Sequence, residues 1–381
     1  MNDPVLSVAI VDDYNNRNYG LDILKFIAMV YVVMIHSFDR GIIQNSDGID
    51  WLLYKFVFLS ISSAVDIFAV VSGYVAYREN NKPFNVKRLV DMWLQVFFYG
   101  VAIVLICDLF TTKPVGKEDY INAFFPLSKD SYWYFTCYFL VYLCSPIINA
   151  SIRAISERLL RKYFIIIVLF FSVACVFTNS IHVVQGCTVT WMYILYFLGA
   201  VMKKCKIGES IKTARLVEGI ILFDILLFVW NTMIMKADFL FFSWDSETLI
   251  SHVSPLYLLS AVFHLILFSR IRVNALIRKL LTRVSPFVFT AYLLNANLFL
   301  YQKVFIGLFD FLIGYNPIFV VITIVVYSFI FVFVSVEIDR LRVRIFNALR
   351  INLFAEWVSK VLTRVVDFFS MRIVENIDRK T

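Results

Sequence analysis

Charged residues are scarce in this sequence. Of its 381 residues, 17% are charged and 60% are hydrophobic, and the mean hydropathy is +0.77. A soluble domain of this size needs much more polar surface, so the composition excludes that class and indicates a membrane protein. The 39 Phe and 20 Tyr suit a lipid-facing shell with amphipathic rings at the membrane interfaces.

Three further features are missing. The basic residues form no single stripe, so the net charge of +8 does not predict a nucleic-acid partner. No CxxC pair occurs among the six cysteines, which argues against a disulfide framework or a metal site. The first apolar segment has Asp12 and Asp13 before it, Lys25 within it and no small-residue cleavage site after it. We therefore interpret it as a retained helix rather than a signal peptide.

Ten apolar runs approach the ~20 residues that a helix needs to cross a bilayer. They lie at roughly 21–38, 52–77, 89–110, 132–150, 163–179, 189–203, 216–235, 249–269, 286–305 and 317–338. The runs at 189–203 and 286–305 are the weakest, with Thr190 and Gly199 in the first and Asn295 and Asn297 in the second, and one of them would suit a re-entrant segment. The sequence thus predicts an all-α membrane protein with about ten transmembrane helices.

The connecting loops alternate in charge. Loops 78–88, 151–162, 203–215 and 270–284 hold four, four, five and five Lys or Arg. The five loops between them, at 39–50, 111–131, 180–188, 236–248 and 306–316, hold one, three, none, one and none. The totals are therefore 18 basic residues against 5, and the two kinds of loop alternate along the chain. By the positive-inside rule, the basic loops and both termini are expected in the cytoplasm.

The ends of the chain differ from its centre. We predict a cytoplasmic segment at 1–20, a transmembrane domain at 21–338 and a basic amphipathic tail at 339–381. Apolar residues recur in the tail at three- and four-residue steps, from Leu353 to Phe369, with basic residues among them. Such a helix suits the anionic cytoplasmic leaflet, or equally the underside of the protein itself.

Ionisable residues inside apolar runs are expensive and therefore mark candidate functional sites. Lys25 and His36 are eleven residues apart in the first run, which places them on one helix face, ~16 Å apart along the axis. Asp66 lies near the middle of the second run. A carboxylate beside an imidazole fixes its tautomer and makes it a better general base. Snorkelling of Lys25, an interfacial His36 and a purely structural Asp66 are the simpler interpretations.

The pair Lys25 and His36, with ten residues between them, resembles the first-helix motif of the integral-membrane acyltransferases called acyltransferase family three. Later blocks resemble the branch of that family that acetylates capsule and other surface polysaccharides. These blocks are DIFAVVSGYV (66–75), KRLVDMWLQVFFYG (87–100), FFPLSKDSYWYFTCYFLVYLCSPIIN (124–149), WMYILYFLGAVMKK (191–204) and EIDRLRVRIF (337–346). The resemblance runs in order from residue 17 to about 350.

The resemblance implies a membrane O-acyltransferase of the cytoplasmic (inner) membrane. Acetyl-CoA would be the acyl donor, and a hydroxyl of a surface or lipid-linked glycan would be the acceptor, with no bound cofactor or metal. His36 would act as general base or transient acyl carrier, oriented by Asp66 and assisted by Lys25.

The resemblance also suggests binding residues. Lys87 and Arg88 would hold a CoA phosphate at the cytoplasmic entry of the third helix, although positive-inside residues are common there. Trp133 and Tyr134 would stack on a sugar ring, unless they belong only to the aromatic belt. Asn295 departs from the family pattern, because residues 289–295 read FTAYLLN where the family usually ends in His. Asn can hydrogen-bond a sugar or a carbonyl but cannot carry a proton.

Two other functions remain open from the sequence. Charged groups in a ten-helix bundle would also suit a transporter or flippase, although no paired Gly- or Pro-broken helices occur in corresponding halves. The Asn295 departure would suit a catalytically inactive relative of the acyltransferases. Substrate-dependent release of CoA distinguishes the enzyme from both.

Overall fold

Asparagine side chains cap several of the long helices. The Oδ1 atoms of Asn18 and Asn85 accept hydrogen bonds from backbone N–H groups at the starts of α2 (Tyr19–Ser37) and α5 (Val86–Phe110). Asn316 does the same at the start of α14 (Pro317–Ala348). Each cap satisfies a backbone donor that would otherwise have no partner at the first turn.

The computed structural model describes residues 17–80, 84–177, 184–234 and 249–378, which contain helices and no strands. Most of the predicted segment 1–20 lies outside these residues. Six helical segments in the described ranges are long and apolar enough to cross a membrane. They are Tyr19–Ile42, Gly48–Ala76, Val86–Phe110, Trp133–Ala154, Thr213–Met233 and Pro317–Ala348. The all-helical membrane class is confirmed, while the count of ten and the cytoplasmic termini stay predictions.

The other four predicted runs take different forms. The run at 163–179 lies mostly in α8 (Glu157–Phe177). The next corresponds to α9 (Val189–Cys205), of 17 residues, and the run at 249–269 to α11 (Pro255–Ser269), of 15 residues. The run at 286–305 is broken into short pieces, including α13 (Phe289–Asn295) and the π-helical turn η4 (Leu300–Val304).

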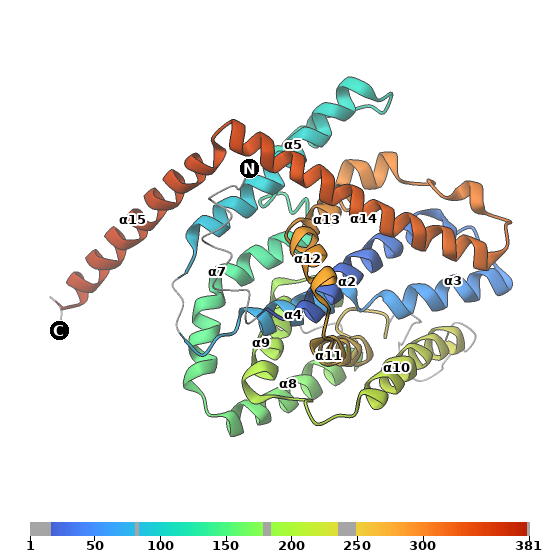
Figure 1. Cartoon of the computed structure of the whole chain (residues 1–381), viewed down its shortest axis with the longest axis horizontal. Helices are drawn as coiled ribbons and strands as arrows, with labels where there is room; N and C mark the ends of the chain where they lie inside the picture. The colour runs from blue at the N-terminus through green and yellow to red at the C-terminus, as the bar shows by residue number, and fades with distance from the viewer. Residues whose placement is uncertain (1–16, 81–83, 178–183, 235–248, 379–381) are drawn as a thin grey trace.

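Helix α2 forms the centre of the bundle (Figure 1). It packs against α4 (Ala64–Ala76), α11, α13 and α14. Its apolar residues, from Leu21 to Phe38, join the main core, so its functional residues are held by neighbours on several sides. At one edge of the bundle, α10 (Thr213–Ile234) packs on α11 and on α3 (Gly48–Ile61).

Helices α4 and α9 cross at close range. A Cβ on Gly73 of α4 would meet the backbone of Tyr196, and a Cβ on Gly199 of α9 would meet the backbone of Val70. Small residues at a crossing let two backbones approach each other, which is the usual way that helices associate in membranes. The side chains of α4 are therefore held in a fixed position relative to α9.

Two of the predicted spans are broken within the bundle. The second span divides at Ser62 and Ser63 into α3 and α4, and the span at 286–305 leaves helical geometry after α13. Neither break contains Gly or Pro, so the sequence does not signal it. Non-helical backbone at membrane depth is tolerated where it borders a cavity, which is the case at both breaks, as described below.

The last span continues past its predicted end at residue 338 as a single helix to Ala348. Ion pairs between Glu337 and Arg340 and between Asp339 and Arg342 lie within these added turns. The chain then turns at Arg350, which has a φ of 55°, into α15 (Ile351–Asp378).

Helix α15 packs on α5 near its start and points away from the bundle toward the C terminus (Figure 1). Apolar side chains on it stay uncovered, with Trp357 61% and Val366 65% exposed. Helix α15 thus packs partly on the protein and keeps part of its apolar face exposed. Binding of this helix to the membrane surface therefore stays a prediction.

Candidate functional site

A cavity of about 350 Å³ lies beside the C-terminal half of α2, and we call it the histidine cavity. From α2 it is lined by Met29, Val32 and His36, which share one helix face. The two broken spans complete it. Val65 and Phe68 come from the first turns of α4, and Ala296 and Leu298 from the chain after α13. Residues that follow the breaks in the two spans therefore contribute to the wall of this cavity.

His36 is paired with Asn295. The Nδ1 atom of His36 is hydrogen-bonded to Oδ1 of Asn295, across α2 and α13. With its oxygen toward the ring, the amide accepts, which favours the tautomer with the proton on Nδ1 and a lone pair on Nε2. An amide can orient a catalytic imidazole in this way, as in enzymes with a Cys-His-Asn arrangement. Asn295 is thus placed to orient the ring of His36.

Arg40 holds Asn295 in place. Helix α2 continues beyond Ser37 into the π-helical turn η1 (Phe38–Ile42), so Arg40 stays inside the bundle at 7% exposure. Its Nη2 donates to the backbone oxygen of Asn295 at 2.6 Å, and its guanidinium lies 4.1 Å from the centroid of the Tyr301 ring. Sequence reasoning counted Arg40 as a loop residue. Its position one helical turn after His36 was the signal that could have identified it.

Tyr301 lies between these groups. Its ring meets that of His36 edge to face at 5.2 Å between centroids, and its hydroxyl donates to Asp39 at 2.8 Å. The four residues His36, Arg40, Asn295 and Tyr301 therefore form one contiguous polar cluster, supplied by α2 with its extension and by the broken span.

The histidine cavity has mainly aromatic walls. Trp133 and Tyr134, which the sequence proposed as sugar-binding residues, both line it at the start of α7 (Trp133–Ala154). The other aromatic side chains on its wall are Phe68, Tyr132, Phe289, Tyr292 and Tyr301. The hydroxyl of Tyr134 is buried without a hydrogen-bond partner among the described residues. A ligand with hydroxyl groups would satisfy it.

Asp66 takes a different partner from the one expected. It lies in the first turn of α4, where the helix dipole favours a negative charge, and its Oδ1 accepts from Nε1 of Trp191 at 3.3 Å. In the described ranges the hydrogen bond of His36 goes to Asn295, so no hydrogen bond joins Asp66 to His36. The sequence could not separate these alternatives, because Asn295 is 259 residues from His36.

Lys25 lies three turns from His36 toward the start of α2 and is half-buried. It is not among the residues that line the histidine cavity. The expected shared face of α2 is present, but the structure does not bring Lys25 and His36 into contact. Assistance of His36 by Lys25 stays a prediction.

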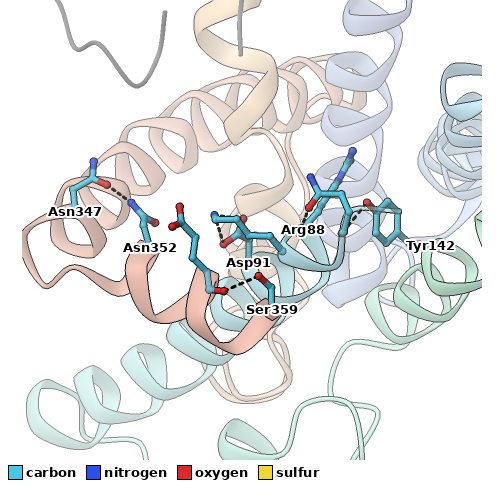
Figure 2. Close-up of polar contacts among 9 residues, drawn as sticks. Arg88, Asp91, Tyr142, Asn347, Asn352 and Ser359 are labelled. Atoms are coloured by element: carbon cyan, nitrogen blue, oxygen red, sulfur yellow. Dashed lines mark hydrogen bonds and ion pairs between the residues drawn. The ribbon is translucent and has the colours of Figure 1, made fainter. Parts of the chain in front are cut away.

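The two proposed CoA-binding residues lie at the start of α5. Lys87 forms an ion pair with Asp91 at 2.9 Å, and the guanidinium of Arg88 lies 5.2 Å from the ring centroid of Tyr142. Figure 2 shows this part of α5 between Tyr142 of α7 and the first turns of α15. The structure thus places both cations together at one end of the bundle, away from the histidine cavity.

Several helices able to cross a membrane, packed in one bundle around an aromatic cavity, define a multi-pass helical membrane protein. The family model described as an acyltransferase domain, that of acyltransferase family three, matches residues 18–337, and the chain belongs to this family. The expected resemblance is therefore confirmed, and the family suggests membrane acyltransferase activity. Searches of curated proteins and of solved structures found no match.

Removing the amide of Asn295 should take away the hydrogen bond that orients the His36 ring and favours its proton on Nδ1. We expect Asn295→Ala to lower kcat of acyl transfer about 100-fold, the lower end of what a positioned general base contributes, with little change in the acceptor KM. Asn295→Asp keeps the accepting oxygen and should retain most of the activity. The measurement is steady-state kinetics of CoA release from purified protein. An equal loss in both variants would show that the side chain serves only packing.

Proposed function

We propose that this protein transfers an acetyl group from acetyl-CoA to a hydroxyl of a surface or lipid-linked polysaccharide, in the cytoplasmic (inner) membrane. Family membership supports acyl transfer in a membrane. The observation that carries the proposal further is the His36–Asn295 pair at the wall of an aromatic cavity.

His36 acts as general base in this proposal. Its Nε2 accepts the proton of the acceptor hydroxyl while the hydroxyl oxygen attacks the thioester carbonyl carbon. The new C–O bond forms, the C–S bond breaks, and the proton passes from His36 to the departing CoA thiolate. The products are an acetyl ester and CoA with a free thiol, and the imidazole returns to its starting form. The alternative is a transient acetyl group on Nε2 itself.

The cavity supports a sugar as the acceptor. Aromatic rings such as Trp133 offer flat apolar surfaces on which the C–H face of a sugar can pack. The free hydroxyl of Tyr134 and Nε2 of His36 offer hydrogen bonds at the same wall. A lipid tail would leave both polar groups unsatisfied, so a hydroxyl-bearing ring fits this cavity better.

The support for binding of acetyl-CoA at the cytoplasmic side is the positive charge at the start of α5. Asp91 neutralises Lys87, so Arg88 is the cation at the start of α5 that carries an uncompensated charge toward a CoA phosphate. This assignment depends on the predicted cytoplasmic position of residues 78–88.

Transport is a second candidate, and one observation favours it. Two broken spans border the histidine cavity, and broken helices often form the binding sites of transporters. Acyl transfer has the additional support of the family and of the oriented imidazole.

The experiment compares surface polysaccharide from cells with the intact gene, with the gene deleted and with the deletion complemented. Mass spectrometry should show acetyl groups in the first and third samples and their loss in the second. Purified protein in nanodiscs should also release CoA from acetyl-CoA when the polysaccharide is added. Unchanged acetylation after deletion, or uptake of the glycan without CoA release, would overturn the proposed enzyme.

A further inference from the structure

A second cavity, of about 600 Å³, shares the wall of Tyr301 with the histidine cavity. We call it the polar cavity. It lies between the extension of α2 on one side and η4 with the chain that follows it on the other. Because Tyr301 lines both spaces, the two cavities lie on either side of this one side chain, and a ligand that occupies both has to pass it.

The polar cavity differs in chemistry from its neighbour. Its side chains include two carboxylates, three amides and a guanidinium, from Asp39, Asp310, Gln44, Asn45, Gln302 and Arg40. Amides and carboxylates together offer both donors and acceptors, which suits a ligand covered with hydroxyl groups. The carboxylates disfavour an anion, and the scarcity of apolar side chains on this wall disfavours a lipid tail.

The polar cavity is held in shape without a ligand. Nε2 of Gln44 donates to the backbone oxygen of Asp39 at 2.6 Å, and the hydroxyl of Tyr301 donates to the Asp39 carboxylate. The N–H of Gly307 donates to the backbone oxygen of Arg40 at 2.9 Å, which ties the two sides together. Gly41 and Gly307 both have positive φ, of 144° and 68°, and a Cβ on either would approach the Asp310 carboxylate. A preformed site costs less ordering on binding.

We propose that the polar cavity is a second sugar subsite, which binds the unit adjacent to the one that receives the acyl group. This inference rests on the proposed function, because it requires a glycan acceptor in the histidine cavity. It adds a size requirement, since the acceptor must contain at least two linked sugar units to fill both cavities. Tyr301, which contacts both units, lies at the position of the linkage between them.

The test uses the full-length protein in nanodiscs with radiolabelled acetyl-CoA. The acceptor is surface polysaccharide from the cells that carry the gene. It is hydrolysed and separated by size into single sugar units, pairs of linked units and longer fragments. Asn45 and Gln302 are exposed side chains on the wall, so the double variant Asn45→Ala with Gln302→Ala should fold normally. Thr112→Ala, on an exposed residue after α5, is the matched control.

We expect the native protein to prefer pairs over single units at least tenfold in kcat/KM, as expected from a few added hydrogen bonds. The double variant should lose about tenfold on pairs and nothing on single units, while the control matches the native protein. Equal use of single units and pairs by the native protein, or an equal loss of both in the double variant, would overturn the second subsite. No transfer to fragments of any size would instead overturn the proposed function, and the subsite would fall with it.

Discussion

Replacing His36 with alanine should reduce acyl transfer by about 10²- to 10⁴-fold, the range that a positioned general base contributes. The loss should appear in kcat, because the walls of the histidine cavity that bind the acceptor stay in place. In cells, the variant should give the same loss of glycan acetylation as deletion of the gene. The measurement combines CoA release by purified protein with mass spectrometry of the polysaccharide.

A second buried histidine provides the control for this prediction. His264 lies on α11, is 8% exposed and is hydrogen-bonded through Nδ1 to the backbone oxygen of Ser260 at 2.8 Å. It does not line the histidine cavity, so His264→Gln should leave kcat unchanged even if it lowers stability. Normal transfer by a correctly inserted His36→Ala protein would remove His36 from the mechanism.

A comparison of the native protein with His36→Ala also separates the two possible roles of His36, general base and acyl carrier. Radiolabelled acetyl-CoA without acceptor should leave no label on the protein if His36 is a general base. Label on the native protein that is absent from His36→Ala would identify an acyl carrier instead.

Substitutions at the α4–α9 crossing should have the largest effect on stability. A Cβ on Gly73 or Gly199 would meet backbone atoms of the facing helix, which cannot rotate away as a side chain can. We expect Gly73→Ala and Gly199→Ala each to destabilise the protein by about 1–3 kcal/mol or more, as for other overpacked cores. The measurements are the thermal melting midpoint in detergent and the yield of monodisperse protein.

Gly116→Ala is the matched control for the crossing. The nearest atom to a Cβ on Gly116 is a side-chain oxygen of Asp119 at 3.7 Å, an ordinary contact. This variant should melt as the native protein does. A Gly73→Ala protein with the native melting midpoint would mean that the two helices can separate slightly at no cost.

The part of the site that depends on helix periodicity along the chain was predictable from the sequence. The ten-residue separation of Lys25 and His36 places both on one helix face, and Trp133 with Tyr134 stands at the start of an apolar run. The structure confirms that α2 is helical through both residues, and it places both aromatic residues on the cavity wall.

The partners of the charged groups were not predictable in the same way. His36 meets Asn295, and Asp66 meets Trp191, 125 residues away. Such pairs depend on which helices are neighbours, and hydrophobicity along the chain does not contain that information. From a single sequence, Asn295 could therefore be noticed as a departure from a family pattern but not assigned a partner.

Hydropathy also could not predict that two of the spans are broken. A window of ~20 residues responds to apolar content, and both broken spans have it despite the interruption of the helix. The break at Ser62 and Ser63 matters for the site, because it turns the middle of an apparent span into the first turn of α4. Asp66 consequently benefits from a helix N-terminus at a depth where the sequence suggested only an isolated charge.

The contact between Arg40 and Asn295 has a consequence for how this family can diverge. The guanidinium holds the main-chain oxygen at position 295 and makes no use of the side chain there. Another residue at this position would keep its backbone anchored, and only its side-chain chemistry toward His36 would change. The histidine that the family resemblance suggests for this position would have the same backbone anchor as the asparagine of this chain. We expect relatives that retain an arginine one turn after the first-helix histidine to tolerate the widest range of residues at this position.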